Sequence, residues 1–422
     1  MQKIAVVGYD NFTSDYLAET AGRREAVEFV PALTREETII EQSGFPFEER
    51  LDLAERRARE AGAEAVITYW DFPSSVIAAF LAKRMEAPYA SVEAVMKCEH
   101  KFWFRREQAK VMDTPGFCAF DPFADDPLDQ ITLDFPFWIK PVVGHSSMLG
   151  FEIKNREDFA AALSEIRSDI EELTRPFAYP LRHTEMPQDL VECGPTLCMA
   201  EELIAQGDQY TIEGFVHGGE MTAYGTVASI REPNGHTFNR YQYPADIDAE
   251  TRKRMEDATD AIIRQIGYDT CPFNIEFFHD PKTGRLNVLE MNSRLSQSHS
   301  HLFDKVDGRP HQTIAVELAL GETPEWRSGA GDFKIAAKHF VRTQKDGVVS
   351  RAPGDDDLKR LHHEMPDVVV ESNVSKGDRL SELPEQESYS YELADLFIGA
   401  QNEEELLRKY DRAIEILPYE ID

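Results

Sequence analysis

Two short apolar segments with a turn between them, residues 273–276 and 286–294, constrain the fold of this chain more than any other feature. The residues between them include Asp-Pro-Lys-Thr-Gly at 280–284, which is typical of a turn, so the segments predict a β-hairpin. Residues two apart on a strand point to the same face, and therefore Glu290, Asn292 and Arg294 share one face. A cross-strand Glu276 on that face would complete a cluster of oxygen ligands beside a guanidinium.

This predicted cluster has two interpretations. Mg²⁺ prefers carboxylate and carbonyl oxygens and shares its coordination shell with phosphates, so the cluster suits Mg²⁺ bound to a nucleotide triphosphate. The alternative is that the same side chains form the charged, solvent-exposed edge of a hairpin. The residues of the hairpin alone leave both interpretations open.

The composition excludes several classes of protein. A chain of 422 residues with 42% hydrophobic residues is long enough for two or three domains with their own cores. The net charge of −32 argues against nucleic acid or an anionic membrane as a partner, because both attract cationic surfaces. We expect a soluble, cytoplasmic protein, since no run of about 18 apolar residues occurs and the apolar start at 4–8 is too short for a signal peptide. The five cysteines form no CxxC pair, which predicts reduced thiols.

Strand and helix patterns alternate over the first hundred residues and predict a small doubly wound α/β unit. A lone Gly8 lacks the glycine spacing of a dinucleotide-binding loop, so binding of NAD is not favoured. The predicted strands are 4–8, 65–69 and 89–91, and the predicted helices are 47–61 and 73–86.

The remaining segments predict a larger central unit and a smaller β-rich unit after it. Strand 135–141 carries Lys140 near its end and leads into a small polar loop at 142–150, the layout of a flexible cover over phosphates. We predict domains at 1–97, 98–330, with a lid subdomain at about 137–205, and 331–422. Further predicted helices are 97–112, 156–170, 249–266, 310–320 and 403–416, further strands are 151–154, 197–204, 209–216, 221–230, 334–343, 368–371 and 391–399, and 174–194 is predicted to be irregular.

The order of these features resembles the ATP-grasp superfamily over essentially the whole chain. The resemblance rests on Lys101, Lys140, the Ser/Gly loop, Glu-Glu-Leu-Ile at 201–204 and Glu-x-Asn-x-Arg at 290–294. The last motif is similar to that of biotin carboxylase, and the overall arrangement looks closest to L-amino-acid ligases of the bacilysin-synthetase type. The resemblance implies an α/β and α+β multidomain protein: an ATP-grasp fold with an N-terminal doubly wound pre-ATP-grasp domain and a small β-rich C-terminal domain.

The resemblance also implies a role for each matching position. Lys101 and Lys140 would hold ATP phosphates as point charges, and Arg294 would neutralise the phosphoryl group during transfer. Glu276, Glu290 and Asn292 would ligate one or two Mg²⁺ ions, with Mn²⁺ as a substitute. The remaining expected contacts are Ser146 and Ser147 with the triphosphate, the backbone of Glu201, Glu202, Leu203 and Ile204 with adenine, Gln209 with ribose, and Arg240 with phosphates unless it is a plain surface arginine.

The implied activity is that of an ATP-dependent carboxylate–amine ligase, which forms an amide through an acyl phosphate and releases ADP and phosphate. Its substrates would be a small-molecule carboxylate, an amino acid in the relatives, and an amine; relatives are often homodimers. Biotin carboxylases carry a glutamate four residues after the motif arginine, where this chain has Ser298. A bicarbonate-using enzyme and a nucleotide-binding protein without turnover are the alternatives.

Two histidines follow the hairpin in the run Ser-Gln-Ser-His-Ser-His at 296–301. His299 and His301 could contact substrate or act as a general base, because imidazole titrates near neutral pH. They could equally belong to a hydrogen-bonded loop behind the metal site. Lys338, His339 and Arg342 lie on an amphipathic strand that either borders the acceptor pocket or is purely structural.

Overall fold

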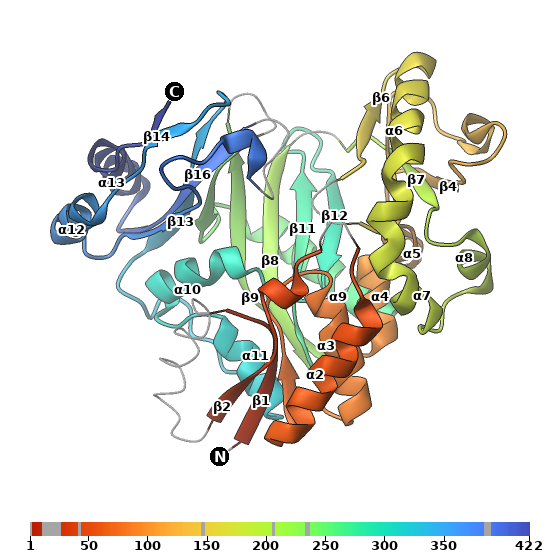
Figure 1. Cartoon of the computed structure of the whole chain (residues 1–422), viewed down its shortest axis with the longest axis horizontal. Helices are drawn as coiled ribbons and strands as arrows, with labels where there is room; N and C mark the ends of the chain where they lie inside the picture. Colours follow the sequence, from red (N-terminus) through yellow and green to blue (C-terminus); the bar gives the residue numbers. More distant parts are fainter. Residues whose placement is uncertain are drawn as a thin grey trace.

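A computed structural model describes residues 2–10, 27–40, 44–144, 148–204, 207–232, 237–383 and 390–422. Within these residues the strands form sheets of three, four, eight and two strands, with helices packed between and around them (Figure 1). The two-stranded sheet pairs β14 (Val349–Arg351) with β17 (Glu420–Ile421). No helix in the described part of the chain is long and apolar enough to cross a membrane.

The three-stranded sheet is parallel and is buried on both faces, as a doubly wound unit requires. One face of its central strand contributes Ala5 and Val7 to a core shared with α2 and α3, and the other contributes Ile4 and Val6 to a core shared with α11. The order is β2 (Val27–Thr34), β1 (Gln2–Tyr9), β3 (Ala65–Ile67), and the helices are α2 (Phe47–Ala61), α3 (Ser74–Met85) and α11 (Gln312–Ala319).

Two predictions near the end of this unit are wrong. Residues 89–91 form no strand, because the Ser91 hydroxyl accepts a hydrogen bond from the Ala94 amide and caps α4 (Val92–Glu99). The predicted helix 97–112 is broken at His100, whose extended backbone and side chain cap a second helix, α5 (Lys101–Gln108). The break makes Lys101 the first residue of α5, where its backbone amide donates to the Val142 carbonyl at 2.7 Å.

The four-stranded antiparallel sheet packs against one long helix, α6 (Arg156–Thr174), and has a core of its own. Its order is β4 (Phe117–Phe120), β7 (Cys198–Glu202), β5 (Phe137–Pro141), β6 (Phe151–Ile153). The segment predicted to be irregular contains the short helices α7 (Ala178–Arg182) and α8 (Gln188–Cys193). Short 3-10 helices occur at Glu36–Thr38, Pro127–Gln130, Arg175–Phe177, Gln297–His299 and Leu380–Glu382.

The eight-stranded sheet runs through the middle of the molecule (Figure 1). Its order is β12 (Leu286–Asn292), β11 (Pro272–His279), β8 (Asp208–His217), β9 (Glu220–Arg231), β10 (Phe238–Tyr243), β13 (Ile335–Thr343), β16 (Tyr391–Ala400), β15 (Val369–Ser372). Of the strands after residue 331, β13, β15 and β16 therefore extend the central sheet, and β14 and β17 pair separately; the domain boundaries stay a prediction.

Helices cover both faces of the strands that extend this sheet. Ala336 of β13 lies in a core with α10 (Ser300–Asp307), whereas its neighbour Ala337 lies in a core with α13 (Glu403–Ile416). Successive residues of a strand point to opposite faces, so α10 and α13 lie on opposite sides of the sheet. The other helices are α9 (Ala249–Ile266) and α12 (Asp355–Glu364).

Candidate functional site

A cleft of about 650 Å³ lies where the first unit, the four-stranded sheet and the α10 face of the central sheet meet. A volume of this size is typical of pockets for small molecules. Tyr69 and Asp71 line it from the loop after β3, and Trp138 lines it from β5. Predicted site residues that line the cleft are Lys101, Lys140, Gln209, Glu276, Glu290, Asn292, Arg294 and His299.

The two carboxylates predicted to bind metal face each other across the hairpin. β11 and β12 pair antiparallel, with Ile275 opposite Met291 and Phe277 opposite Val288. Because of this irregular register, Glu276 lies opposite Leu289 and Glu290. Burial, with the nearby Glu290 carboxylate adding to it, raises the pKa of Glu276 to about 7. The Gln209 amide donates to Glu276 at 3.0 Å. Two carboxylates held this close repel each other, and a divalent cation between them would remove that repulsion.

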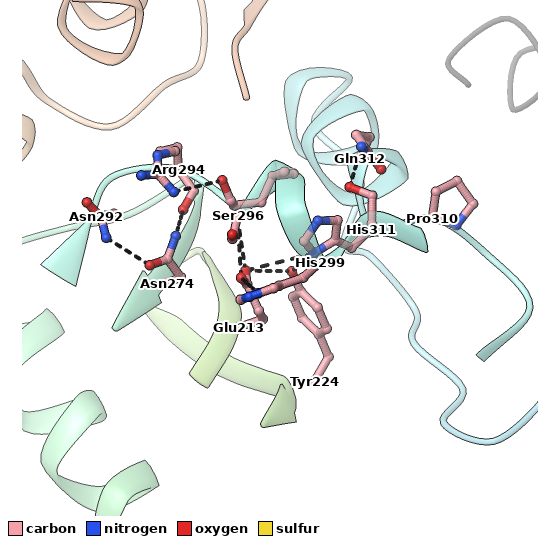
Figure 2. A network of polar contacts seen from close by, with 12 residues as sticks. Glu213, Tyr224, Asn274, Asn292, Arg294, Ser296, His299, Pro310, His311 and Gln312 are labelled. Carbon is pink, nitrogen blue, oxygen red and sulfur yellow. Dashed lines mark hydrogen bonds and ion pairs between the residues drawn. The ribbon is translucent and has the colours of Figure 1, made fainter. Parts of the chain in front are cut away.

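The third predicted ligand, Asn292, has its amide group oriented by a neighbour. Its Nδ2 donates to Oδ1 of Asn274 at 2.9 Å, and Nδ2 of Asn274 donates to the Arg294 carbonyl at 3.0 Å (Figure 2). The carbonyl oxygen of Asn292 therefore stays available to a cation. The described residues hold no group of three or more His, Cys, Asp or Glu side chains suited to a metal, and two carboxylates with one amide oxygen fit Mg²⁺ that takes its other ligands from phosphates and water.

Arg294 lies just beyond the end of β12 and is held by a residue that the sequence did not reveal. Its Nη2 lies 2.5 Å from Oδ2 of Asp71. Partial removal from water inside the cleft would raise the pKa of Asp71, but the Arg294 guanidinium holds it below its ordinary value. Asp71 follows β3, and the carboxyl ends of parallel strands are where α/β folds place binding residues. That position was the one sequence signal that could have identified Asp71.

The two predicted phosphate lysines have different surroundings. Nζ of Lys101 donates to the Gly144 carbonyl at 2.8 Å, and burial lowers the pKa of Lys101. Nζ of Lys140 lies 2.9 Å from the Glu201 carboxylate, which also pairs with Arg105 at 2.5 Å. The single charge of the Glu201 side chain is therefore shared between two cations beside the cleft.

Several other predicted residues do not line the cleft as it stands. The Glu202 carboxylate accepts a hydrogen bond from the Gly116 amide at 2.8 Å, and Leu203 is exposed. Glu201, Glu202, Leu203 and Ile204 are not among the cleft-lining residues. Ser146 and Ser147 lie outside the described residues.

The structure does not bring Arg240 to the cleft. Tyr241 lines the cleft from β10, so strand alternation turns Arg240 to the opposite face. There its guanidinium lies 2.5 Å from Glu403 of α13. Arg231 is the cation that β9 supplies to the cleft, where it donates to Gln209 at 2.6 Å.

The two histidines after the hairpin separate because they lie on helical turns and not on a strand. His299, at the end of the 3-10 helix, lines the cleft, whereas His301 packs against Phe397 with ring centroids 4.3 Å apart. Nδ1 of His299 lies 2.8 Å from Oε1 of Glu213, which is fully buried on β8 (Figure 2). Sequence reasoning missed Glu213, although it shares a strand face with Gln209 and Thr211, which line the cleft.

Lys338, His339 and Arg342 lie outside the cleft lining. Lys338 pairs with Asp395 at 2.7 Å, His339 stacks on Tyr410 of α13, and Arg342 pairs with Glu392 at 2.6 Å.

Comparison with known proteins gives one family and a set of similar folds. Residues 133–301 match a family model described as an ATP-grasp domain. The carbamoyl phosphate synthase large chain of Acidobacterium capsulatum is 27% identical over 243 residues, which are 56% of this chain and 20% of that protein. The corresponding protein of Thermus thermophilus is 54% identical over 69 residues, which are 16% of this chain and 7% of that protein. The chain thus spans a fifth or less of the length of these relatives.

Two solved structures are similar over almost their whole length. The L-amino acid ligase from Bacillus licheniformis has a TM-score of 0.75 at 18% identity, with 100% of this chain and 99% of that chain covered. Biotin carboxylase from Campylobacter jejuni, solved as a β-γ-ATP complex, has a TM-score of 0.66 at 14% identity, with 100% and 92% covered. At these identities the likeness concerns the fold.

Proposed function

Because this chain contains an ATP-grasp domain and has the ATP-grasp fold that its sequence predicts, we propose that it is an ATP- and Mg²⁺-dependent ligase. It joins a small-molecule carboxylate, such as an amino acid, to an amine and releases ADP and phosphate. The observation that carries the proposal is the gathering of Lys101, Lys140, the Glu276–Glu290 pair and Arg294 in one cleft. Such a set of charges suits a triphosphate at one end and a transferring phosphoryl group at the other.

The chemistry requires activation of the carboxylate. An ionised carboxylate is a poor electrophile, and transfer of the γ-phosphoryl group converts it to an acyl phosphate with a good leaving group. The neutral amine then attacks the carbonyl carbon and the C–N bond forms. The C–O bond to phosphate breaks with its electron pair going to phosphate, and the nitrogen loses one proton, which the departing phosphate takes up. No covalent bond to the protein is needed, so the side chains act by position and charge.

Each charged side chain has a distinct task in this scheme. Lys101 and Lys140 hold the phosphates, and Glu276, Glu290 and Asn292 hold the Mg²⁺, which supplies neutralising charge to the triphosphate when bound. Arg294 neutralises the acyl phosphate, with Asp71 fixing its orientation. An acyl phosphate is lost to water if the site is wet, and Tyr69, Trp70, Trp138 and Tyr241 provide apolar walls to the cleft.

A bicarbonate-using reaction is the second candidate, because the curated relatives are named carbamoyl phosphate synthase. In that case bicarbonate takes the place of the organic acid. Ser298 lines the cleft at the position where biotin carboxylases carry a glutamate, which supports the amide-forming reaction over carboxylation. A nucleotide-binding protein without turnover is the third candidate.

One screen separates the three candidates. ADP release is measured with MgATP against a matrix of amino acids, short acids and amines, and active wells are analysed by mass spectrometry. A ligase gives ADP that depends on both an acid and an amine, together with a product lighter than their sum by one water. Bicarbonate-stimulated ADP release without an amine supports the second candidate. Binding of ATP without any release of ADP supports the third.

Two variants show whether the activity belongs to this cleft. Glu290→Gln removes the negative charge of one predicted Mg²⁺ ligand and should abolish ADP release. Glu415→Gln makes the same chemical change on the exposed face of α13 and should leave it intact. Full activity in Glu290→Gln would contradict the proposal. The amino-acid specificity, the cytoplasmic location, the homodimer and the domain boundaries remain predictions.

A further inference from the structure

Glu213 is a carboxyl group buried beneath the cleft, and among the described residues no Lys or Arg side chain forms an ion pair with it. Its side chain is 0% exposed. Nδ1 of His299 lies 2.8 Å from Oε1, and the Ser296 amide donates to Oε1 at 3.2 Å (Figure 2). On the other oxygen, the Tyr224 hydroxyl donates to Oε2 at 3.4 Å, and Nδ1 of His311 lies 3.8 Å away. All of these partners are uncharged at neutral pH when the histidines are neutral.

Such surroundings favour the protonated carboxyl. An ionised carboxylate removed from water needs a paired cation, and without one it takes up a proton. Burial raises the pKa of Glu213 well above its ordinary value; Glu276 adds to the rise, and Arg294 opposes it without overcoming it. Burial likewise lowers the pKa of His299 well below its ordinary value, with His311, Lys338 and Arg294 acting in the same direction. The pair is therefore a carboxylic acid beside a neutral imidazole.

The proton arrangement of the pair decides what His299 offers to the cleft. A protonated Glu213 donates its O–H to Nδ1 of His299, and a neutral imidazole that accepts at Nδ1 carries its hydrogen on Nε2. His299 lines the cleft, while Glu213 lies on the buried side of the ring. The ring edge away from Glu213 is thus the edge that carries an N–H donor toward the cleft.

We propose that Glu213 is a positioning residue that fixes His299 as a neutral hydrogen-bond donor, with Nε2–H directed at the carbonyl oxygen of the acyl phosphate. The inference deepens the proposed ligase function and rests on it. When the amine attacks, negative charge develops on that carbonyl oxygen, and a preorganised donor stabilises it. The charge disappears when the C–O bond to phosphate breaks, and His299 keeps its proton throughout.

The same network explains why a neutral donor stays in place beside Arg294. Glu213 also accepts the Ser296 amide, so it fixes the turn that joins Arg294 to His299. Asn274 holds the Arg294 carbonyl on the other side (Figure 2). A fixed donor needs no reorganisation when the charge develops, which is the source of its catalytic effect.

The first test measures turnover in matched variants. Glu213→Gln mimics the protonated carboxyl, since its amide N–H donates to Nδ1 of His299, and should retain most of the wild-type kcat. Glu213→Ala and His299→Phe remove the arrangement and should lower kcat about 10²–10³-fold, as loss of one oxyanion donor does, with little change in the KM for ATP. If the kcat of Glu213→Gln is as low as that of Glu213→Ala, the ionised carboxylate is required and the proposal is overturned.

The second test reads the tautomer without any turnover. Protein labelled with ¹⁵N-histidine has 12 histidines, and His299→Phe identifies the resonances of His299. The expected spectrum shows Nε2 protonated and Nδ1 unprotonated, in wild type and in Glu213→Gln. A protonated Nδ1 would overturn the proposal. Because this readout needs no substrate, it stays informative if the ligase assignment itself fails.

A control variant guards against a general loss of packing. Asp307 is a second buried carboxyl group, on α10 and outside the cleft. It accepts hydrogen bonds from Tyr243 at 2.8 Å and from Trp326 at 2.9 Å. Asp307→Asn makes the same carboxyl-to-amide change and should leave the His299 resonances unchanged. A shift of the tautomer in Asp307→Asn would show that the arrangement does not depend on Glu213 in particular.

Discussion

The ion cluster of Glu201 with Arg105 and Lys140 gives the sharpest prediction about stability. Glu201 pairs with Arg105 at 2.5 Å and with Lys140 at 2.9 Å, and its side chain is 4% exposed. Arg105 also donates to the Val288 carbonyl at 2.8 Å, so the cluster joins the four-stranded sheet, α5 and the hairpin strand β12. Glu201→Gln keeps the shape of the side chain but leaves two cations without their counter-charge.

The expected cost follows from which charges remain buried. Removing one partner of a buried ion pair costs roughly 3–5 kcal/mol. Lys140 reaches solvent and Arg105 keeps its carbonyl contacts, so we expect about 3 kcal/mol, the lower end of that range. For a cooperative unit of ordinary domain size this corresponds to a decrease in Tm of roughly 6–12 °C.

The assay is thermal and urea unfolding of Glu201→Gln beside Glu202→Gln. Glu202 is the next residue and undergoes the same change, but it is exposed, and among the described contacts its carboxylate accepts only the Gly116 amide. We expect Glu202→Gln to cost less than about 1 kcal/mol, because this hydrogen bond is exposed to solvent and the amide oxygen of Gln can still accept it. Equal destabilisation by the two variants would refute the reasoning.

The pH dependence gives an independent check with a defined sign. Burial raises the pKa of Glu201, but Lys140 and Arg105 outweigh burial and hold it below its ordinary 4.5. A depressed pKa contributes stability that is present above about 4.5 and is lost as the pH falls through the folded-state value. In Glu201→Gln this part of the acid destabilisation should be missing.

Three further predictions concern the cleft and its surroundings. Asp71→Asn frees the guanidinium of Arg294 and should leave folding stability almost unchanged. Steady-state kinetics should show kcat reduced roughly 10- to 100-fold, as misplacement of a catalytic group does. An unaltered kcat would contradict the role of Asp71. Arg240→Gln should leave turnover unchanged, because its ion pair with Glu403 lies on the opposite face of the sheet, and a large loss of kcat would place Arg240 at the reaction after all. Burial, with the Asp71 carboxylate adding to it, raises the pKa of Glu99 to about 8, whereas its pKa in the unfolded chain is near 4.5. The stability of the fold therefore falls as the pH rises between these two values. Glu99→Gln should flatten the dependence of Tm on pH over this window, and an unchanged slope would contradict the assignment.

Local patterns predicted the regular elements well. Helices α2, α9 and α13 have the bounds that the apolar periodicity predicts, and Gly62, Asp248 and Asn402 lie at their ends as ordinary caps. The break at His100 was not predictable in this way, because the residues on both sides favour a helix. It depends on the pairing of the Lys101 backbone with Val142, a contact between distant segments.

Strand alternation predicted part of the site and left the rest undetermined. It placed Glu290 and Asn292 on one face, and both line the cleft. It could equally have separated Arg240 from Tyr241, but the sequence does not say which face of a strand meets a cleft. Asp71 and Glu213 were missed because their partners, Arg294 and His299, lie far away in the chain.

The path of oxygen through the reaction tests the central claim most directly. Once the screen has identified the acid, it is supplied with both carboxylate oxygens labelled with oxygen-18, together with MgATP and the amine. Formation of an acyl phosphate transfers one labelled oxygen to the released phosphate, and the amide retains the other. Mass spectrometry of the phosphate should therefore show one labelled oxygen per turnover; unlabelled phosphate would contradict activation of the carboxylate by phosphorylation.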